Sequence, residues 1–183
     1  MKINAKLLEN NGTDRMFLYQ IRNNVEVRAT LIKNSHIDWF DHIDWFNNYF
    51  IRKDQEIYIL SGLMNDKMIK VGYVNILFTD ECVEIGVKID PVYQGRGFGT
   101  ESFDFIFKQA KLTKKRIILT VFDNNVKAIK MYEKKGFRII NKSVIDLDVL
   151  LTMEYKPRLY KARKLGNIFN FISKVYNLNI YKK

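Results

Sequence analysis

Three glycines at alternate positions, Gly95, Gly97 and Gly99, lie between a run rich in β-branched residues and a run with a helical apolar stripe. A strand that turns through glycines into a helix leaves the first helical N–H groups without backbone acceptors, and the helix dipole adds partial positive charge there. Such a turn is typical of phosphate or pyrophosphate binding. Glycine tolerates positive φ and lets a ligand approach the backbone. The sequence therefore predicts a phosphate-binding loop, with Arg96 as a further cation at its rim.

The spacing within this loop separates it from two common phosphate motifs. Thr100 and Glu101 follow Gly99, so the third glycine of the dinucleotide fingerprint G-x-G-x-x-G is missing. The lysine and hydroxyl residue of a P-loop are also missing. Gln94, Gly97 and Gly99 form the pattern Gln-x-x-Gly-x-Gly. This pattern resembles the acetyl-CoA pyrophosphate loop of the GNAT superfamily of N-acetyltransferases.

A second stretch carries the same resemblance. Asn125 opens a predicted helix directly after a strand, Ala128 and Tyr132 follow within it, and the pair Gly136 and Phe137 ends it. This order is similar to the second motif of the superfamily. The resemblance covers residues 56–137 well and the rest of the chain loosely.

The resemblance implies an α/β (α+β) GNAT fold, with a mixed, mostly antiparallel central sheet, a splayed parallel strand pair and flanking helices. It implies acetyl-CoA as co-substrate. No metal is expected, because one cysteine and two histidines are too few for a structural zinc cluster. The pantetheine arm is expected between the splayed strands, where it pairs with the backbone of Val87 and Ile89 and is hydrogen-bonded by Asn125. The cofactor-binding residues of the glycine loop are expected to be Gln94, Gly95, Arg96, Gly97, Phe98, Gly99 and Thr100.

Acetyl transfer to an amine needs a neutral amine, a stabilised oxyanion and a proton for the leaving thiolate. Tyr132 is the predicted proton donor, because it follows Asn125 by seven residues, about two helical turns, and faces the same side. The family arrangement implies that its hydroxyl lies near the sulfur.

Glu84 is the predicted general base. It interrupts an apolar strand, where a carboxylate is costly unless it is paired or faces a cleft, and a raised pKa would suit base work through water. The alternative is a solvated or salt-bridged strand glutamate. His36 and His42 are weaker candidates for the base.

The acceptor amine is predicted from a finer resemblance. The segments 22–24, 35–38 and 84–86 look like the branch that acetylates amino-sugar nucleotides for bacterial surface glycans, the pseudaminic-acid pathway among them. That branch implies the 4-amino group of a UDP-amino-deoxy sugar as acceptor. The first two helices would then build the pocket, and its expected residues are Arg22, His36, Trp39, Trp45, Tyr49 and Tyr73. The duplicated His-Ile-Asp-Trp-Phe and the basic tail depart from this branch.

The aromatic helix after Ser35 also has a simpler interpretation. Trp39, Ile43, Phe46 and Phe50 fall on one helical stripe, which predicts the face toward the core, whereas Trp45 and Tyr49 fall off it. The aromatic residues off the stripe either line the acceptor pocket or are additional aromatic residues of a helix that packs on the core.

The composition predicts a folded cytoplasmic protein. The chain has 183 residues, with 47% hydrophobic and 14% aromatic residues, which suits one domain over residues 1–156 and a basic amphipathic extension over 157–183. No apolar run approaches the ~20 residues of a membrane span, and the first residues do not form a secretory signal. Cys82 is the single cysteine, which excludes a disulfide framework.

The net charge of +11 predicts anionic partners such as coenzyme A, a nucleotide sugar, RNA or an anionic membrane. Two alternatives to the amino-sugar acceptor stay open. One is a ribosomal-protein or N-terminal amine acetyltransferase, and the other is a non-catalytic module that binds acyl-CoA or a polyanion. No nucleic-acid motif is recognisable. The tail is expected to pack on the domain or on a second subunit of a homodimer, with contact to a membrane surface as the alternative.

Hydrophobic periodicity predicts the remaining elements. Strands are expected over residues 2–8, 56–61, 68–78, 82–89, 115–121, 137–140 and 150–155, with an antiparallel meander in the middle of the chain. Helices are expected over residues 14–22, from residue 35, over 101–110 and over 126–135. Thr13 and Ser35 are the expected N-caps of the first two. A turn is expected at residues 62–67 and a loop at 141–148.

Overall fold

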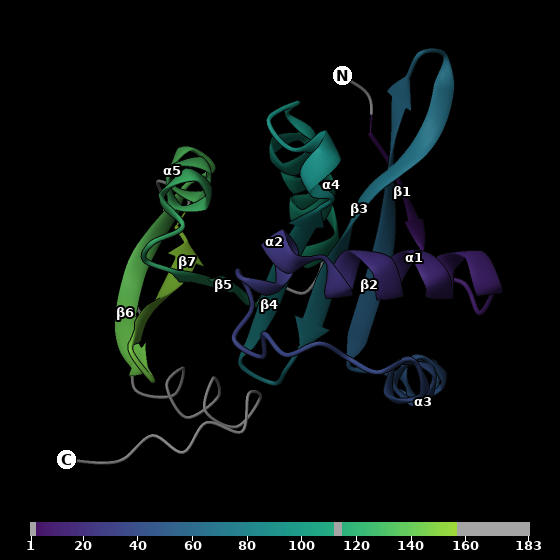
Figure 1. Ribbon diagram of the computed structural model, residues 1–183. Coiled ribbons are helices and arrows are strands. Elements are labelled where there is room, and N and C mark those ends of the chain that lie inside the picture. The colour runs from purple at the N-terminus through teal and green to yellow at the C-terminus, as the bar shows by residue number, and fades with distance from the viewer. Residues whose placement is uncertain (1–2, 112–114, 157–183) are drawn as a thin grey trace. The chain divides into compact units, whose positions relative to one another are not determined.

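The computed structural model describes residues 3–111 and 115–156. In chain order its elements are β1 (Ile3–Leu7), α1 (Gly12–Asn23), α2 (Val25–Arg28), α3 (Trp39–Tyr49), β2 (Gln55–Met64), β3 (Lys67–Phe78), β4 (Cys82–Ile89), the 3-10 helix η1 (Pro91–Tyr93), α4 (Phe98–Lys111), β5 (Arg116–Phe122), α5 (Val126–Lys134), β6 (Phe137–Ile145) and β7 (Asp148–Tyr155) (Figure 1). The extension over residues 157–183 lies outside the described residues, as do the predictions made for it.

The strands form one sheet in the order β1-β2-β3-β4-β5-β7-β6. The β1–β2, β2–β3, β3–β4 and β6–β7 pairs are antiparallel, and β4 pairs with β5 in parallel. The parallel ladder runs from Cys82–Arg116 to Glu84–Ile118, so the last five residues of β4 extend beyond it. The predicted fold class, including the splayed parallel pair, is confirmed.

The chain divides into two compact units, residues 1–119 and residues 120–183. In the first unit, α1 and α3 cover one face of the sheet: Leu18 and Phe46 pack against Ile57 and Ile59 of β2. The α4 helix packs on the opposite face, where the ring of Phe105 contacts Tyr58 with centroids 4.7 Å apart. Gly62 is required there, because a Cβ atom on it would lie 2.2 Å from the ring of Phe98. The sheet therefore separates the α1–α3 side from the α4 side.

The hairpin between β2 and β3 is tighter than the sequence predicted. Both strands extend to a two-residue turn, Asn65 and Asp66, and both residues have positive φ (46° and 61°). Asn and Asp tolerate this conformation, which matches the twist of a hairpin. The expected turn over residues 62–67 was therefore wrong at both ends, whereas the antiparallel meander is confirmed.

Two predicted helix caps were wrong. Asn11, and not Thr13, caps α1: its Oδ1 accepts from the Asp14 N–H at 2.8 Å. Asp38, and not Ser35, caps α3, where its Oδ1 accepts from the Phe40 N–H at 2.8 Å. Thr13 lies inside the first turn of α1 and Ser35 lies three residues before Asp38, so neither occupies the N-cap position, from which a side chain reaches the orphan N–H groups.

The buried face of α3 also differs from the predicted stripe. His42, Phe46 and Tyr49 are buried, whereas Phe50 is 38% exposed and Trp39 is half-buried. Five of the eleven residues of the helix are aromatic, and two of them, Phe40 and Trp45, are exposed, so periodicity alone did not identify the face that packs on the sheet.

In the second unit, β6 and β7 form a hairpin with its turn at Asp146 (φ 53°) and Leu147. The loop expected over residues 141–148 is therefore mostly strand. Gly136 ends α5 with φ 99°, as its position in the sequence predicted. A Cβ atom on Gly136 would lie 3.1 Å from the ring of Tyr155, so a side chain there would also press on that ring.

Candidate active site

The glycine loop follows β4 and opens α4. Asp90 caps η1 by accepting from the Val92 N–H at 3.0 Å, and the Gln94 side chain donates to the Ile89 carbonyl at 3.1 Å. Gly95 and Gly97 then take positive φ (76° and 87°). A Cβ atom at either glycine would meet nothing within 4 Å, so the loop surface is open to a ligand.

Buried side chains hold the start of α4 in place. The Gly97 carbonyl accepts the Glu101 N–H at 3.0 Å, which places the amides of Phe98, Gly99 and Thr100 in the first turn. Phe98 is 1% exposed and anchors the loop, and Ser102 donates to the Gly99 carbonyl at 2.8 Å. Gly99 does not have positive φ, so the conformational prediction holds for Gly95 and Gly97 alone.

Three residues of β4 share the sheet face covered by α1 and α3. Glu84 lies opposite Leu77, Gly86 lies opposite Asn75, and Lys88 lies opposite Tyr73 in the β3–β4 ladder. Alternate residues of a strand point to one face, and directly opposed residues share it. Tyr73 packs on the same cluster as Leu18 and Phe46, which identifies this face. Glu84 is 5% exposed, and the structure therefore places the predicted base in a buried position.

Lys88 is a residue of this face that the sequence reasoning missed. Its signal in the sequence was the same as that of Glu84: a charged residue in an apolar strand, two positions from Gly86. Burial lowers the pKa of Lys88 to about 8, and the nearby Arg22 lowers it further, whereas Glu84 opposes the shift. Burial also raises the pKa of Tyr73 to about 12, so its hydroxyl stays protonated at neutral pH.

The aromatic residues predicted for the acceptor pocket lie in different environments. Tyr49 is in the core, where its hydroxyl accepts from the Ile57 N–H at 2.9 Å. Trp39 is half-buried and its ring contacts Tyr19 edge-on, with centroids 4.9 Å apart. Trp45 is 40% exposed. The side chains of Trp39 and Trp45 thus border the surface, and Tyr49 supports the core beneath them.

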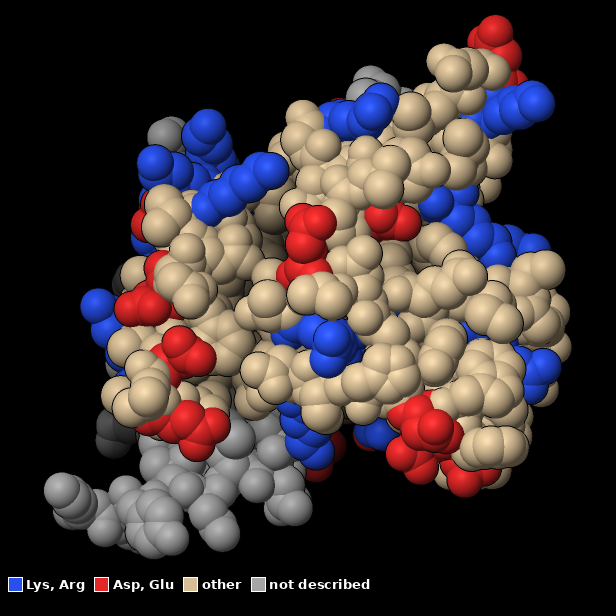
Figure 2. All heavy atoms as spheres, in the orientation of Figure 1, with Lys and Arg blue, Asp and Glu red and all other residues tan. Residues whose placement is uncertain are grey.

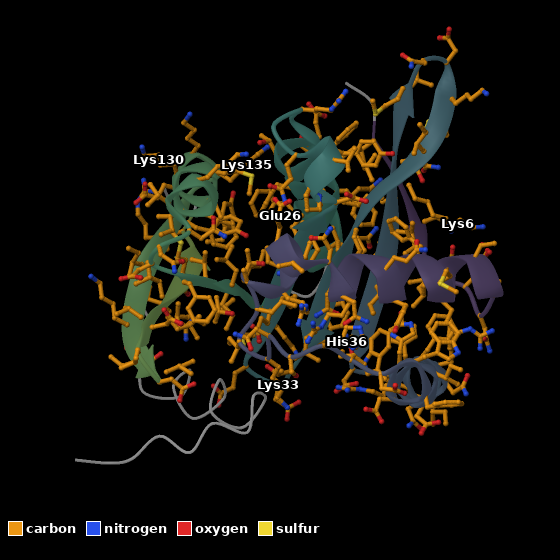
Figure 3. All side chains as sticks on the ribbon, in the orientation of Figure 1. Lys6, Glu26, Lys33, His36, Lys130 and Lys135 are labelled. Carbon is orange, nitrogen blue, oxygen red and sulfur yellow. The ribbon has the colours of Figure 1, made fainter. Side chains whose placement is uncertain are left out.

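The two histidines also differ. His42 is buried and its Nε2 donates to the Arg15 carbonyl at 3.0 Å, and burial lowers its pKa. Its imidazole is therefore neutral and already engaged. His36 is exposed on the segment that joins α2 to α3 (Figure 3), and its ring contacts Tyr19 with centroids 6.3 Å apart.

That segment, residues 29–38, is held by side chains from α1 and α2. Arg22 donates to the carbonyls of Lys33 and Ser35, and Arg28 donates to the Asn34 carbonyl at 3.3 Å. Arg22 was predicted to bind substrate. The structure places its guanidinium on this segment, where it also interacts electrostatically with Tyr73 and Lys88.

In the second unit, Asn125 begins α5 as its sequence position predicted. Its Oδ1 accepts from the Ala128 N–H at 3.2 Å. Tyr132 lies two turns further on and its ring contacts Phe137 with centroids 6.1 Å apart. Burial raises the pKa of Tyr132 to about 12, so the phenol holds its proton at neutral pH. This protonation state is the one a proton donor needs.

A match to a protein-family model identifies the family of the chain. Residues 16–137, more than half of the 183 residues, match the model described as the acetyltransferase (GNAT) family. The chain belongs to the GNAT family. The glycine loop and the helix from Asn125 to Tyr132 fall inside the matched range of this GNAT chain.

Individual relatives match over less of the GNAT chain. A spermine/spermidine N(1)-acetyltransferase of Bacillus subtilis is 42% identical over 52 residues, which are 27% of this chain and 34% of that relative. The chain thus spans about a third of the length of the curated relatives of this name that it matches.

Solved structures share the fold of the GNAT chain over most of its length. A domain from Methanocaldococcus jannaschii is 24% identical with a TM-score of 0.70, and the match covers 84% of this chain and 98% of that one. A spermidine N-acetyltransferase from Vibrio cholerae in complex with CoA and spermine is 19% identical with a TM-score of 0.72, covering 83% and 94%.

Two expectations concern what the GNAT chain binds. Acetyl-CoA as co-substrate agrees with the family, whose members use it. Within residues 3–111 and 115–156, no three His, Cys, Asp or Glu side chains gather as a metal site would require. In the same ranges no helix is long and apolar enough to cross a bilayer.

Proposed function

We propose that the chain is an N-acetyltransferase that transfers the acetyl group of acetyl-CoA directly to a primary amine in a ternary complex. The family match over residues 16–137 carries this proposal. The open loop at Gly95 and Gly97 supports it, because its exposed backbone suits a pyrophosphate. The pyrophosphate would lie on the amides from Gly95 to Thr100, with Arg96 at the rim.

The free end of β4 supports the expected path of the pantetheine arm. The parallel ladder stops at Glu84, so the stretch containing Val87 and Ile89 lies beyond it. Backbone groups there are the proposed partners of the pantetheine amides. The Asn125 side chain, whose oxygen caps α5, would donate its Nδ2 hydrogens to the same arm.

The proposed chemistry is a single displacement at the thioester. The amine nitrogen attacks the carbonyl carbon, the C–S bond breaks, and the product is an amide and free CoA. Tyr132 would protonate the leaving thiolate, since its raised pKa keeps the proton available. Glu84, a buried carboxylate on β4, would accept the proton of the amine through water.

Two classes of acceptor have support. The Bacillus subtilis relative named for spermine and spermidine favours a polyamine. The cations Arg22 and Lys88 on the face that carries Glu84 favour an amine with an anionic group, such as the predicted amino-sugar nucleotide. In the view of Figure 2, Lys and Arg lie at several separate places on the visible surface.

The decisive experiment measures thiol release from acetyl-CoA over an acceptor panel of spermine, spermidine, UDP-amino sugars and peptides with basic N-termini. We expect turnover on at least one small primary amine, which a Gly97→Val variant loses. Turnover on peptides alone would move the enzyme to the protein-modifying class. Tight CoA binding without turnover on any amine would support the non-catalytic module instead.

The homodimer and the cytoplasmic location stay predictions. Light scattering coupled to size exclusion, with and without CoA, measures the oligomeric state directly.

A further inference from the structure

Three side chains on neighbouring elements bring an unusual set of charges together on the face of the sheet under α1. Lys88 lies on β4 opposite Tyr73 on β3, and Arg22 near the end of α1 interacts electrostatically with both. Two cations and a phenol, each on a half-buried side chain, thus interact with one another.

No negative charge in the described part of the chain neutralises this group by direct contact. Among those residues Lys88 forms no ion pair and no hydrogen bond. Among the same residues, Arg22 forms no ion pair with a carboxylate. Its Nη1 and Nη2 groups donate to the backbone carbonyls of residues 35 and 33. Lys88 interacts electrostatically with an acidic group, Glu84, which lies four residues away on the same strand. Like charges held together away from water are costly, and a bound anion would remove that cost.

Gly86 leaves room between Lys88 and Glu84. A Cβ atom on Gly86 would meet one neighbour, the Cβ of Asn75 at 4.0 Å. The other glycines of these strands are different, because a Cβ atom on Gly62 or Gly72 would lie 2.2 Å from another atom. The surface over Gly86 is therefore the position on this face where a substrate group can lie between the ammonium and the carboxylate.

We infer that Lys88, Arg22 and the Tyr73 hydroxyl form a subsite for an anionic group of the acceptor, a phosphate or a carboxylate, and that the acceptor amine then lies over Gly86 beside Glu84. This inference rests on the proposed function and gives the acceptor its chemical class. The two cations attract the anion, and the phenol donates a hydrogen bond to it. The same two cations repel a polyamine, which brings only further positive charge.

Lys88→Met tests the subsite, because it removes the charge and keeps the length of the side chain. With acetyl-CoA saturating, we expect kcat/KM for a UDP-amino sugar to fall at least tenfold, mainly through KM. The value for the same amino sugar without its diphosphate should be unchanged. Lys67→Met is the matched control, since it removes one exposed lysine from the β2–β3 hairpin. Lys88→Arg should keep the preference for the anionic acceptor.

A binding measurement tests the subsite without turnover. Pyrophosphate and malonate are titrated separately into wild type and Lys88→Met by calorimetry, with CoA saturating so that the glycine loop is occupied. We expect one of the two anions to bind wild type and to bind Lys88→Met at least tenfold more weakly, and that anion identifies the group. If neither anion binds wild type, or both variants bind equally, the inference is wrong.

The two proposals fail in different ways. An equal loss of kcat/KM on anionic and neutral acceptors in Lys88→Met, with thiol release intact in wild type, overturns the subsite and leaves the acetyltransferase standing. Absence of turnover on every acceptor overturns the acetyltransferase, whereas the calorimetry still decides the subsite. Circular dichroism and a thermal melt of Lys88→Met show whether the variant is folded.

Discussion

Asn23 binds the backbone of Ile37 with both ends of its side-chain amide: Nδ2 donates to the carbonyl at 3.0 Å and Oδ1 accepts from the N–H at 2.9 Å. The pair joins the end of α1 to the segment that precedes α3. We expect Asn23→Ala to lower the free energy of unfolding by about 1–3 kcal/mol, because two partly buried backbone groups lose their partner. Urea denaturation measures this, with the exposed Asn48→Ala as control. Equal losses in both variants would contradict the structural role.

Tyr132→Phe should lower turnover at least tenfold and leave the affinity for acetyl-CoA nearly unchanged. The substitution removes the proposed proton donor and keeps the ring that contacts Phe137. The raised pKa of Tyr132, about 12, predicts that activity does not fall between pH 7 and 10 through loss of this proton. Steady-state kinetics and CoA calorimetry separate the two effects. Tyr58→Phe, which removes a hydroxyl that donates to Glu56 on the same strand, β2, is the control. Unchanged turnover in Tyr132→Phe would exclude Tyr132 as the acid.

Gly97→Val should abolish binding of acetyl-CoA while the protein stays folded. Gly97 has φ 87°, a conformation in which valine is strained by about 1–3 kcal/mol, so the loop must rearrange. Because the loop is exposed, the rearrangement leaves the core intact. Calorimetry with CoA and circular dichroism are the two measurements. Gly12→Val, at an exposed glycine without positive φ, is the matched control. Normal CoA affinity in Gly97→Val would remove the loop from the cofactor site.

Acid should destabilise the protein through His42. Burial lowers its pKa in the folded state below the ordinary value of 6.5, so below about pH 6.5 the unfolded chain binds more protons and the folded state loses stability. The contribution is fully present above pH 6.5 and is lost as the pH falls toward the folded pKa. We expect the free energy of unfolding to drop less between pH 7.5 and 5.5 in His42→Gln than in wild type. His36→Gln, which replaces the exposed histidine, is the matched control.

The parts of the site that follow local rules were predictable from the sequence. Positive φ at Gly95 and Gly97 follows from the turn between a strand and a helix, and the cap at Asn125 follows from its position before an apolar run. These features depend on a few neighbouring residues, so a short stretch of sequence contains the whole cause.

The parts that depend on packing were not predictable in this way. The environment of Lys88 arises from Tyr73 on β3 and Arg22 on α1, and no spacing in the sequence brings these residues together. The buried face of α3 was missed because aromatic residues lie on both its buried and its exposed sides and because His42, an ionisable residue, is buried. Register and helix docking decide both cases, and they are properties of the folded chain.

The hydrogen bonds that hold residues 29–38 have a consequence for how acceptor preference could change. Arg22, Asn23 and Arg28 contribute the side chains, whereas the segment contributes mainly backbone carbonyls and one N–H. Backbone groups are present whatever the residue type. Apart from Asp38, whose side chain caps α3, the segment can therefore exchange its side chains, His36 included, without losing its anchors. It is a natural place to transplant or randomise sequence when a new acceptor is wanted on an unchanged scaffold.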